Sequence, residues 1–188
     1  MTLPSHWEAR AQALIDAASP REGNLFRSVE MAYAHPDDVV SGEGTRLYGS
    51  RFAKPGVRAV YGSADEETAL RESAARARRL AGVSIIEYPR VTYVIALKAA
   101  NCVELDTRNS DAAALLPTCL APNDLDASQQ VGEFFRTHGV QAIGYPSAIR
   151  GYDGRNLVVF RDVASPPRIV LVNRDRILED LRRIAKRL

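Results

Sequence analysis

Apolar residues recur along this chain at two periods, and the order of these periods is the feature that most constrains its fold. Helical spacing, with apolar residues three or four positions apart, is found in residues 7–18, 63–81, 129–138 and 177–188. Strand-like apolar runs occupy residues 25–27, 91–98, 140–145, 157–160 and 168–172. The two kinds of segment are mixed without a regular strand–helix–strand repeat, and neither GxGxxG nor GxxxxGK[ST] occurs. This pattern disfavours a Rossmann or P-loop nucleotide site.

Two of the predicted helices carry start signals. Ser5 and Glu8 have the spacing of a capping box, in which the two side chains bind backbone N–H groups of the first turn. Ser63 and Glu66 repeat this spacing before a run of good helix formers. The predicted buried stripe of this second helix consists of Leu70, Ala74, Ala77 and Ala81.

Length, charge and cysteine count exclude several classes of protein. A chain of 188 residues is expected to form one domain with an ordinary hydrophobic core. Twenty-five basic and 23 acidic residues leave a net charge of +2, too little to attract nucleic acid by bulk charge. Cys102 and Cys119 form no CxxC pair, so we expect two reduced thiols and no metal. No apolar run approaches the roughly 18 residues of a membrane span. Residues 1–20 lack a secretory signal, and a cytoplasmic location is expected.

A glycine-rich polar segment, residues 37–62, is too irregular for a long helix and too long for a plain turn. Long structured loops often carry function. Arg46 and Arg51 lie among glycines that let backbone N–H groups approach a ligand, the combination that binds phosphate or pyrophosphate. Alternatively, these arginines are solvated or pair with nearby acids such as Glu43.

Three other residues stand out by their position. Glu72 is spaced to form an i,i+4 ion pair with Arg76, and it does not lie on the predicted apolar stripe, which favours a surface ion pair. Tyr61 is either part of the core or an aromatic platform for a flat ring at the mouth of a site. Ser147 lacks the flanking glycines of a GxSxG nucleophile elbow, which favours a structural or ligand-binding hydroxyl over a hydrolase nucleophile.

Taken in order, these pieces resemble the RES-domain toxins, a family named after an arginine, a glutamate and a serine. The resemblance rests on residues 25–27, 42–52, 60–61, 69–72, 145–148 and 156–160. It implies an α+β fold similar to that of ADP-ribosyltransferases, with a mixed or antiparallel sheet, flanking helices, and helices at both ends. Residues 1–24 are then expected to form an N-terminal helical arm, residues 25–173 the catalytic core, and residues 174–188 a C-terminal helix packed on it.

The resemblance also implies a substrate and a set of site residues. Members of the family consume NAD+, either releasing nicotinamide by hydrolysis or phosphorolysis or transferring ADP-ribose to a protein. Carried over position by position, the catalytic residues are Glu72, Arg27 and Arg51. Contacts with NAD+ are assigned to Arg27, Arg46, Tyr48, Arg51, Tyr61, Ser147 and Asn156. NAD+ is the substrate, and no metal is implied.

The chemistry of NAD+ suits this inventory. Nicotinamide leaves a cationic substrate without the general acid that an O-glycoside needs. One carboxylate, that of Glu72, can stabilise the developing oxocarbenium ion. Arg27 and Arg51 would hold the pyrophosphate, and Tyr61 would stack on nicotinamide. Where the family usually has Gly-Gly-Arg-Trp-Asn, residues 49–53 are Gly-Ser-Arg-Phe-Ala, which leaves water, phosphate and a protein side chain open as acceptors.

The family's toxins are paired with an antitoxin whose C-terminal part covers the active site. A cognate antitoxin is therefore expected, with an acceptor protein if ADP-ribose is transferred, and with no membrane and no direct nucleic-acid partner. One alternative is an RNA-binding or RNA-cleaving toxin that uses the arginines of residues 71–79 and the C-terminal helix. Another is an inactive module that keeps only the fold.

Overall fold

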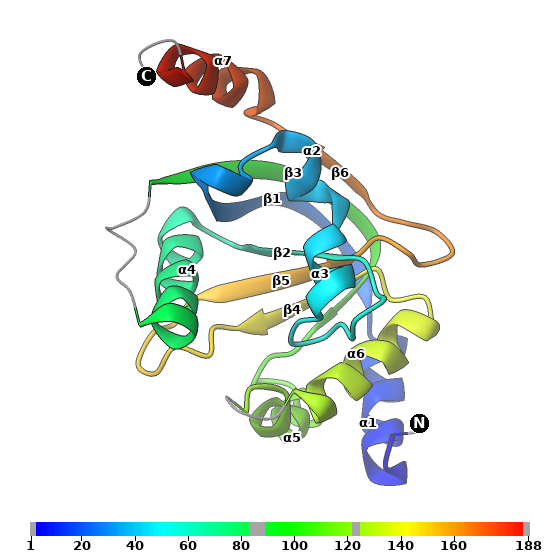
Figure 1. The fold of residues 1–188 in the computed structure, drawn as a ribbon. Helices are drawn as coiled ribbons and strands as arrows, with labels where there is room; N and C mark the ends of the chain where they lie inside the picture. Colours follow the sequence, from blue (N-terminus) through cyan, green and yellow to red (C-terminus); the bar gives the residue numbers. More distant parts are fainter. Residues whose placement is uncertain (1–2, 83–88, 122–124, 186–188) are drawn as a thin grey trace.

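The structure is a computed structural model that describes residues 3–82, 89–121 and 125–185 (Figure 1). Its strands are β1 (Ser19–Glu30), β2 (Ala59–Ser63), β3 (Arg90–Glu104), β4 (Ala142–Pro146), β5 (Arg155–Phe160) and β6 (Arg168–Leu171). Its helices are α1 (Ser5–Asp16), the 3-10 helix η1 (Met31–Tyr33), α2 (Pro36–Ser41), α3 (Glu43–Tyr48), α4 (Glu66–Ala81), α5 (Ser110–Cys119), α6 (Asp126–Thr137) and α7 (Arg174–Ala185).

These strands form one mixed sheet, within which β1, β2, β5, β4 and β3 close into a ring. β1 pairs with β3 in antiparallel register over its whole length, and its other edge meets β2 where Phe26 lies opposite Ser63. β2, β5 and β4 follow as antiparallel neighbours, and β4 returns to β3 as a parallel partner. β6 pairs with β3 outside the ring. The predicted α+β class with a mixed sheet is therefore confirmed.

Two hydrophobic cores lie on opposite faces of β2, β5 and β4. Successive side chains of a strand point to opposite faces, so Leu157 and Val159 join the core inside the ring, whereas Val158 and Phe160 join the core beneath the helices. The outer core is covered by α1, α5 and α6, which gather on one side of the sheet (Figure 1). The interior of the ring is filled from β1 and β3 by side chains such as Leu25.

Helix α4 begins later than the sequence predicts. The capping role given to Ser63 is wrong, because this residue ends β2 and its hydroxyl donates to Asn156 Oδ1 over 2.8 Å. Asp65 caps the helix instead, accepting from the backbone N–H of Thr68 over 2.7 Å. Ser5 is likewise not a cap, because Pro4 already occupies the N-cap of α1 and makes no side-chain cap bond.

The inward face of α4 also differs from the predicted stripe. Leu70 is 38% exposed, whereas Thr68 and Ala69 are buried and Glu72 is half-buried. The side chain of Ala81 lies outside the described residues. A helix turns by about 100° per residue, so a shift of one or two positions in the buried stripe brings Glu72 to the inner side of α4.

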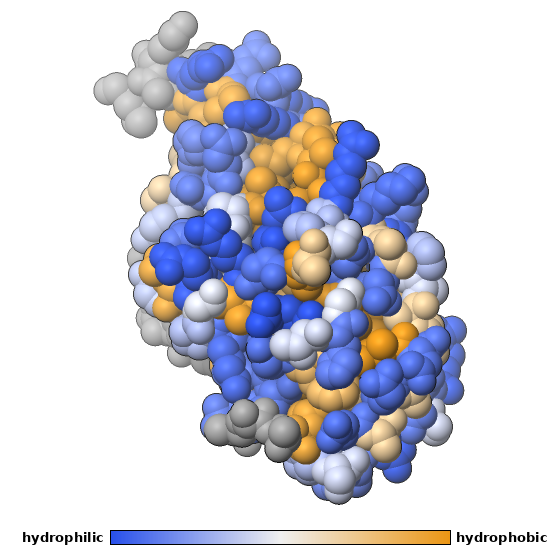
Figure 2. Space-filling view, turned by 90° about the vertical axis from the view of Figure 1, so that its right-hand side faces the viewer, coloured by the Kyte–Doolittle hydropathy of each residue, from blue (hydrophilic) through white to orange (hydrophobic). Residues whose placement is uncertain are grey.

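The chain ends in an amphipathic helix that packs on the inner core through Ile177 and Leu181, as its periodicity predicts; residues 186–188 lie outside the described part. Two of its arginines are paired, Arg174 with Asp37 over 3.2 Å and Arg183 with Asp180 over 2.7 Å. Apolar side chains reach the surface beside β6 and α7, including Val170, Val172 and Ile184 (Figure 2).

Within the described ranges, no helix is long and apolar enough to cross a membrane.

Candidate active site

The centre of the candidate site is the carboxylate of Glu72, which accepts hydrogen bonds from two buried side chains. Glu72 Oε1 accepts from Ser147 Oγ over 2.6 Å and from Asn156 Nδ2 over 2.7 Å. Three elements thereby converge on one atom, since Glu72 lies on α4, Ser147 directly follows β4, and Asn156 lies on β5. Both bonds use Oε1, which leaves Oε2 free of these two donors. The ion pair between Glu72 and Arg76 that helical spacing allows is not formed in the described part of the chain.

Asn156 and Ser147 are themselves fixed by further hydrogen bonds. Ser63 Oγ donates to Asn156 Oδ1, which orients the amide so that its NH2 group faces Glu72. Ser147 Oγ also accepts from the backbone N–H of Ile149 over 3.2 Å. Asn156 and Ser147 are 7% and 8% exposed, so the network is satisfied where water has little access. Ser63 was missed as a site residue, although strand alternation puts it on the same face as Tyr61.

Arg27 lies on β1, is bonded to β2 at Tyr61, and carries an unsatisfied nitrogen. Its Nη1 donates to the carbonyl oxygen of Tyr61 over 2.8 Å. Its Nε is buried and has no hydrogen-bond partner among the described residues. Burial, together with the positive charge of Arg76, lowers the pKa of Arg27 from 12.5 to about 10, while Tyr61 opposes the shift. A buried guanidinium group with an unpaired nitrogen is suited to bind an anionic ligand.

Tyr61 links β2 to the loop after Gly49. Its hydroxyl accepts from the backbone N–H of Phe52 over 2.9 Å, and burial raises its pKa to about 12. The ring of Phe52, 1% exposed, meets the ring of Tyr145 edge to face at 4.9 Å between centroids. Burial raises the pKa of Tyr145 well above its ordinary value, and the negative charge of Glu72 adds to the shift. Phe52, which replaces the family's usual tryptophan, therefore packs inside the outer core.

Arg51 is bonded to the end of α5. Its Nη1 donates to the carbonyl oxygens of Cys119 over 2.7 Å and of Ala121 over 3.2 Å. The same loop is held from α6, where Gln129 Nε2 donates to the carbonyl oxygen of Ser50 over 2.9 Å. Gly132 lies so close to the Phe52 backbone that a Cβ atom there would overlap the Phe52 carbonyl. α5 and α6 therefore fix the loop that carries Arg51.

Arg46 and Tyr48, which the family resemblance assigns to NAD+ binding, are not part of the hydrogen-bond network of Glu72. Arg46 Nε donates to both carboxylate oxygens of Glu43, over 2.8 and 2.9 Å. Arg58 joins the same carboxylate at 3.1 Å. Tyr48 is 80% exposed at the end of α3. Arg46 thus adopts the acid-paired alternative that the sequence left open.

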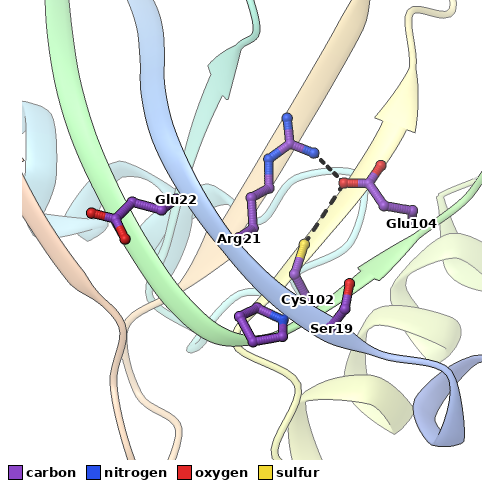
Figure 3. A pocket seen from close by; sticks show the side chains of 6 residues that line it. Ser19, Arg21, Glu22, Cys102 and Glu104 are labelled. Atoms are coloured by element: carbon purple, nitrogen blue, oxygen red, sulfur yellow. Dashed lines mark hydrogen bonds and ion pairs between the residues drawn. The ribbon is translucent and has the colours of Figure 1, made fainter.

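A second cluster of charged side chains lies where the start of β1 meets the end of β3 (Figure 3). Arg21 and Arg155 both bind the carboxylate of Glu104, Arg155 through Nη2 at 2.5 Å. The Cys102 thiol points at the same carboxylate (Figure 3), and burial together with the Glu104 charge raises its pKa to about 12. A cavity of about 400 Å³ opens beside this Glu104 cluster. No group of three or more histidine, cysteine or acidic side chains in the described ranges could hold a metal ion.

Fold and site together define a class: an α+β protein in which a serine and an asparagine at the ring of strands hold one carboxylate from a neighbouring helix. A family model, that of the RES domain, matches residues 24–179, and the chain belongs to this family. The expected membership is thereby confirmed. The fold is similar to that of a chain in the crystal structure of the M. tuberculosis MbcT–MbcA toxin–antitoxin complex. The TM-score is 0.66 at 20% identity, and the similarity covers 94% of this chain and 97% of that chain. No curated protein matches the sequence.

Proposed function

We propose that this chain is the toxin of a toxin–antitoxin pair and cleaves the nicotinamide–ribose bond of NAD+. The observation that supports this most strongly is the environment of Glu72. Its carboxylate is oriented by two neutral donors, Ser147 and Asn156, and is not neutralised by an arginine in the described part of the chain. A negative charge held in a fixed direction is what a developing glycosyl cation needs.

The reaction breaks the bond between the ribose C1′ atom and the nicotinamide nitrogen, and the bonding electrons leave with nicotinamide. Because the ring nitrogen begins positively charged, nicotinamide departs neutral and needs no proton. Glu72 stabilises the oxocarbenium character at C1′. The acceptor oxygen then forms a bond to C1′ and releases its proton to solvent. Water, phosphate and a protein side chain are the candidate acceptors.

Arg27 binds the anionic part of the substrate in this proposal, since its buried Nε has no partner in the described structure. Tyr61 offers its half-buried ring for stacking on nicotinamide while its hydroxyl is held by the Phe52 backbone. Ser147 and Asn156 act through Glu72 and not on the substrate directly, which assigns them a positioning role.

The partner in this proposal is an antitoxin that covers the site in the cytoplasm until the toxin is released. Membership of the RES family supports it, as does the fold shared with a toxin–antitoxin complex. The RNA alternative is less well supported, because Arg71 is engaged by Glu67 at 2.7 Å and lies over the Tyr152 ring at 4.6 Å. Arg71 is therefore less available to phosphates.

The test is nicotinamide release from NAD+ by the purified protein, with and without phosphate. We expect release by the native chain and a loss of at least about 100-fold in kcat for Glu72→Gln. The matched control is Glu67→Gln, which makes the same change at a 65% exposed position of α4. A requirement for phosphate would identify phosphorolysis. Undiminished release by Glu72→Gln would overturn the role of Glu72, and no ADP-ribose product under any condition, including labelled NAD+ in cell extract, would overturn the proposed function.

A further inference from the structure

Arg27 on β1 and Arg76 on α4 are two cations without an acidic partner in the described part of the chain, and Ser73 Oγ on α4 bonds to the carbonyl oxygen of Ser28, the neighbour of Arg27 on β1. No ion pair in the described part of the chain includes either residue, and Arg27 Nε has no partner of any kind there. The proximity of the two charges is reflected in the pKa of Arg27, which Arg76 lowers. Because like charges repel, holding such a pair in the folded protein costs electrostatic free energy. Binding of an anionic ligand would lower this cost.

Arg76 lies on the same face of α4 as the catalytic carboxylate. Residues three or four positions apart lie on one side of a helix, so Arg76 shares the side of Glu72, and Ser73 shares the side of Arg76. Ser73 Oγ donates to the carbonyl oxygen of Ser28 over 3.2 Å, which ties this face of α4 to β1 next to Arg27. Helix α4 therefore holds Arg76 on a face that lies beside β1.

The other arginines around the site are already bonded to the protein. Arg90 pairs with Glu30 at 3.5 Å and donates to the carbonyl oxygen of Ser28 over 3.1 Å. Arg51 donates to the carbonyl oxygens of Cys119 and Ala121, at and just after the end of α5. Arg76 makes no such bond within the described residues and is exposed, so its guanidinium group is available to a ligand.

We propose that Arg76, together with Arg27, forms the clamp for the pyrophosphate of NAD+, and that Arg51 positions the loop after Gly49 instead. This inference rests on the proposed function, because the ligand is taken from it. Four residues of helix rise by about 6 Å, so Glu72 and Arg76 can address two neighbouring parts of one nucleotide. Glu72 would face the C1′ atom of the ribose, and Arg76 the phosphate carried by its C5′ atom.

The inference is tested by binding, independently of turnover. Calorimetric titration of the purified chain with inorganic pyrophosphate and with ADP-ribose is compared for the native sequence, Arg76→Gln and Arg78→Gln. We expect Arg76→Gln to raise both dissociation constants by at least about tenfold, the loss of one charge-assisted contact. Arg78→Gln removes the same charge from an exposed position off this face of α4 and is expected to bind like the native chain. In nicotinamide release, Arg76→Gln is expected to raise KM and leave kcat within about twofold.

Three results would overturn the clamp: no pyrophosphate binding by the native chain, equal binding by Arg76→Gln and the native chain, or equal losses in both variants. The two proposals fail in different ways. Arg76-dependent pyrophosphate binding without NAD+ cleavage would retain the clamp and reject the proposed function. NAD+ cleavage with the same KM in Arg76→Gln and in the native chain would retain the proposed function and reject the clamp.

Discussion

The candidate site and the Glu104 cluster use the same residue types in opposite ways. At Glu104, two arginines bind one carboxylate and more than neutralise its charge. At Glu72, a hydroxyl and an amide hold the carboxylate, while Arg27 stands nearby without an ion pair in the described structure. A glutamate that binds arginines of neighbouring strands links those strands. A glutamate held by neutral donors instead has no cationic partner, so its negative charge can act on a ligand.

This difference also separates the two clusters by the kind of damage that a substitution should cause. Groups that satisfy one another contribute to stability, and groups left unsatisfied in the free protein are available for ligands. The comparison therefore predicts large effects on activity around Glu72 and effects on stability alone around Glu104.

The largest effect after loss of Glu72 itself is expected for Asn156→Ala. This change removes one donor from Glu72 Oε1 and deprives Ser63 Oγ of its acceptor. We expect kcat for nicotinamide release to fall by about 10- to 100-fold, with KM little changed, because the carboxylate loses its fixed direction. Ser147→Ala should act in the same way. The control is Asn24→Ala at an exposed position of β1, and a fall in thermal stability without a fall in kcat would make Asn156 purely structural.

A smaller effect, on stability, is expected for Glu104→Gln. The neutral amide leaves Arg21 and Arg155 facing each other, and because these side chains are about one-third exposed, solvent screens part of the loss. We expect a decrease of about 1–2 kcal/mol in the free energy of unfolding, measured in urea, and unchanged nicotinamide release. Glu22→Gln is the control, since Glu22 is 73% exposed in its pair with Lys98. If Glu104→Gln instead lost activity without losing stability, the Glu104 cluster would have a role in the reaction and not in holding the fold together.

The smallest effect is expected for the thiols, one near each region. Burial raises the pKa of Cys102 and of Cys119 to about 12, so both remain protonated at pH 8. Iodoacetamide should label neither in the native protein and both in urea, as mass spectrometry would show. Unfolded thiols lose their protons near pH 9, before the folded ones, so stability should decrease as pH rises above about 9. Rapid native labelling of Cys102 would mean that the Glu104 cluster opens readily.

The sequence predicted the fold class and most segments, because apolar periodicity reports burial directly. It did not predict α5, which contains Pro117, a residue that normally argues against a helix interior. The capping boxes at Ser5 and Ser63 were wrong, because Pro4 and Asp65 provide the helix starts instead. Local signals of one or two residues are easily displaced by tertiary contacts.

Local sequence signals were also insufficient to find the candidate site. Periodicity placed Glu72 on the solvated side of α4, and only the family resemblance predicted a catalytic role for it. The structure brings Glu72, Ser147 and Asn156 together from segments far apart in the sequence, which no spacing rule could show. Ser63 contributes through a side-chain hydrogen bond that depends on the register of β2 and β5. Such cross-strand pairings are set by the whole sheet.

The closed ring of strands also governs when during synthesis the site can exist. β1 finds its long partner only when β3 has been made, and β2 must wait for β5, where Ala59 pairs with Phe160. Such distant pairings close late, after the intervening chain is available. Asn156 is among the last site residues to leave the ribosome, so a nascent chain has no assembled site for most of its translation. In a protein of this topology the hydrogen-bond network of Glu72 therefore cannot form until β5 has been made, so the proposed activity would begin only near the end of synthesis.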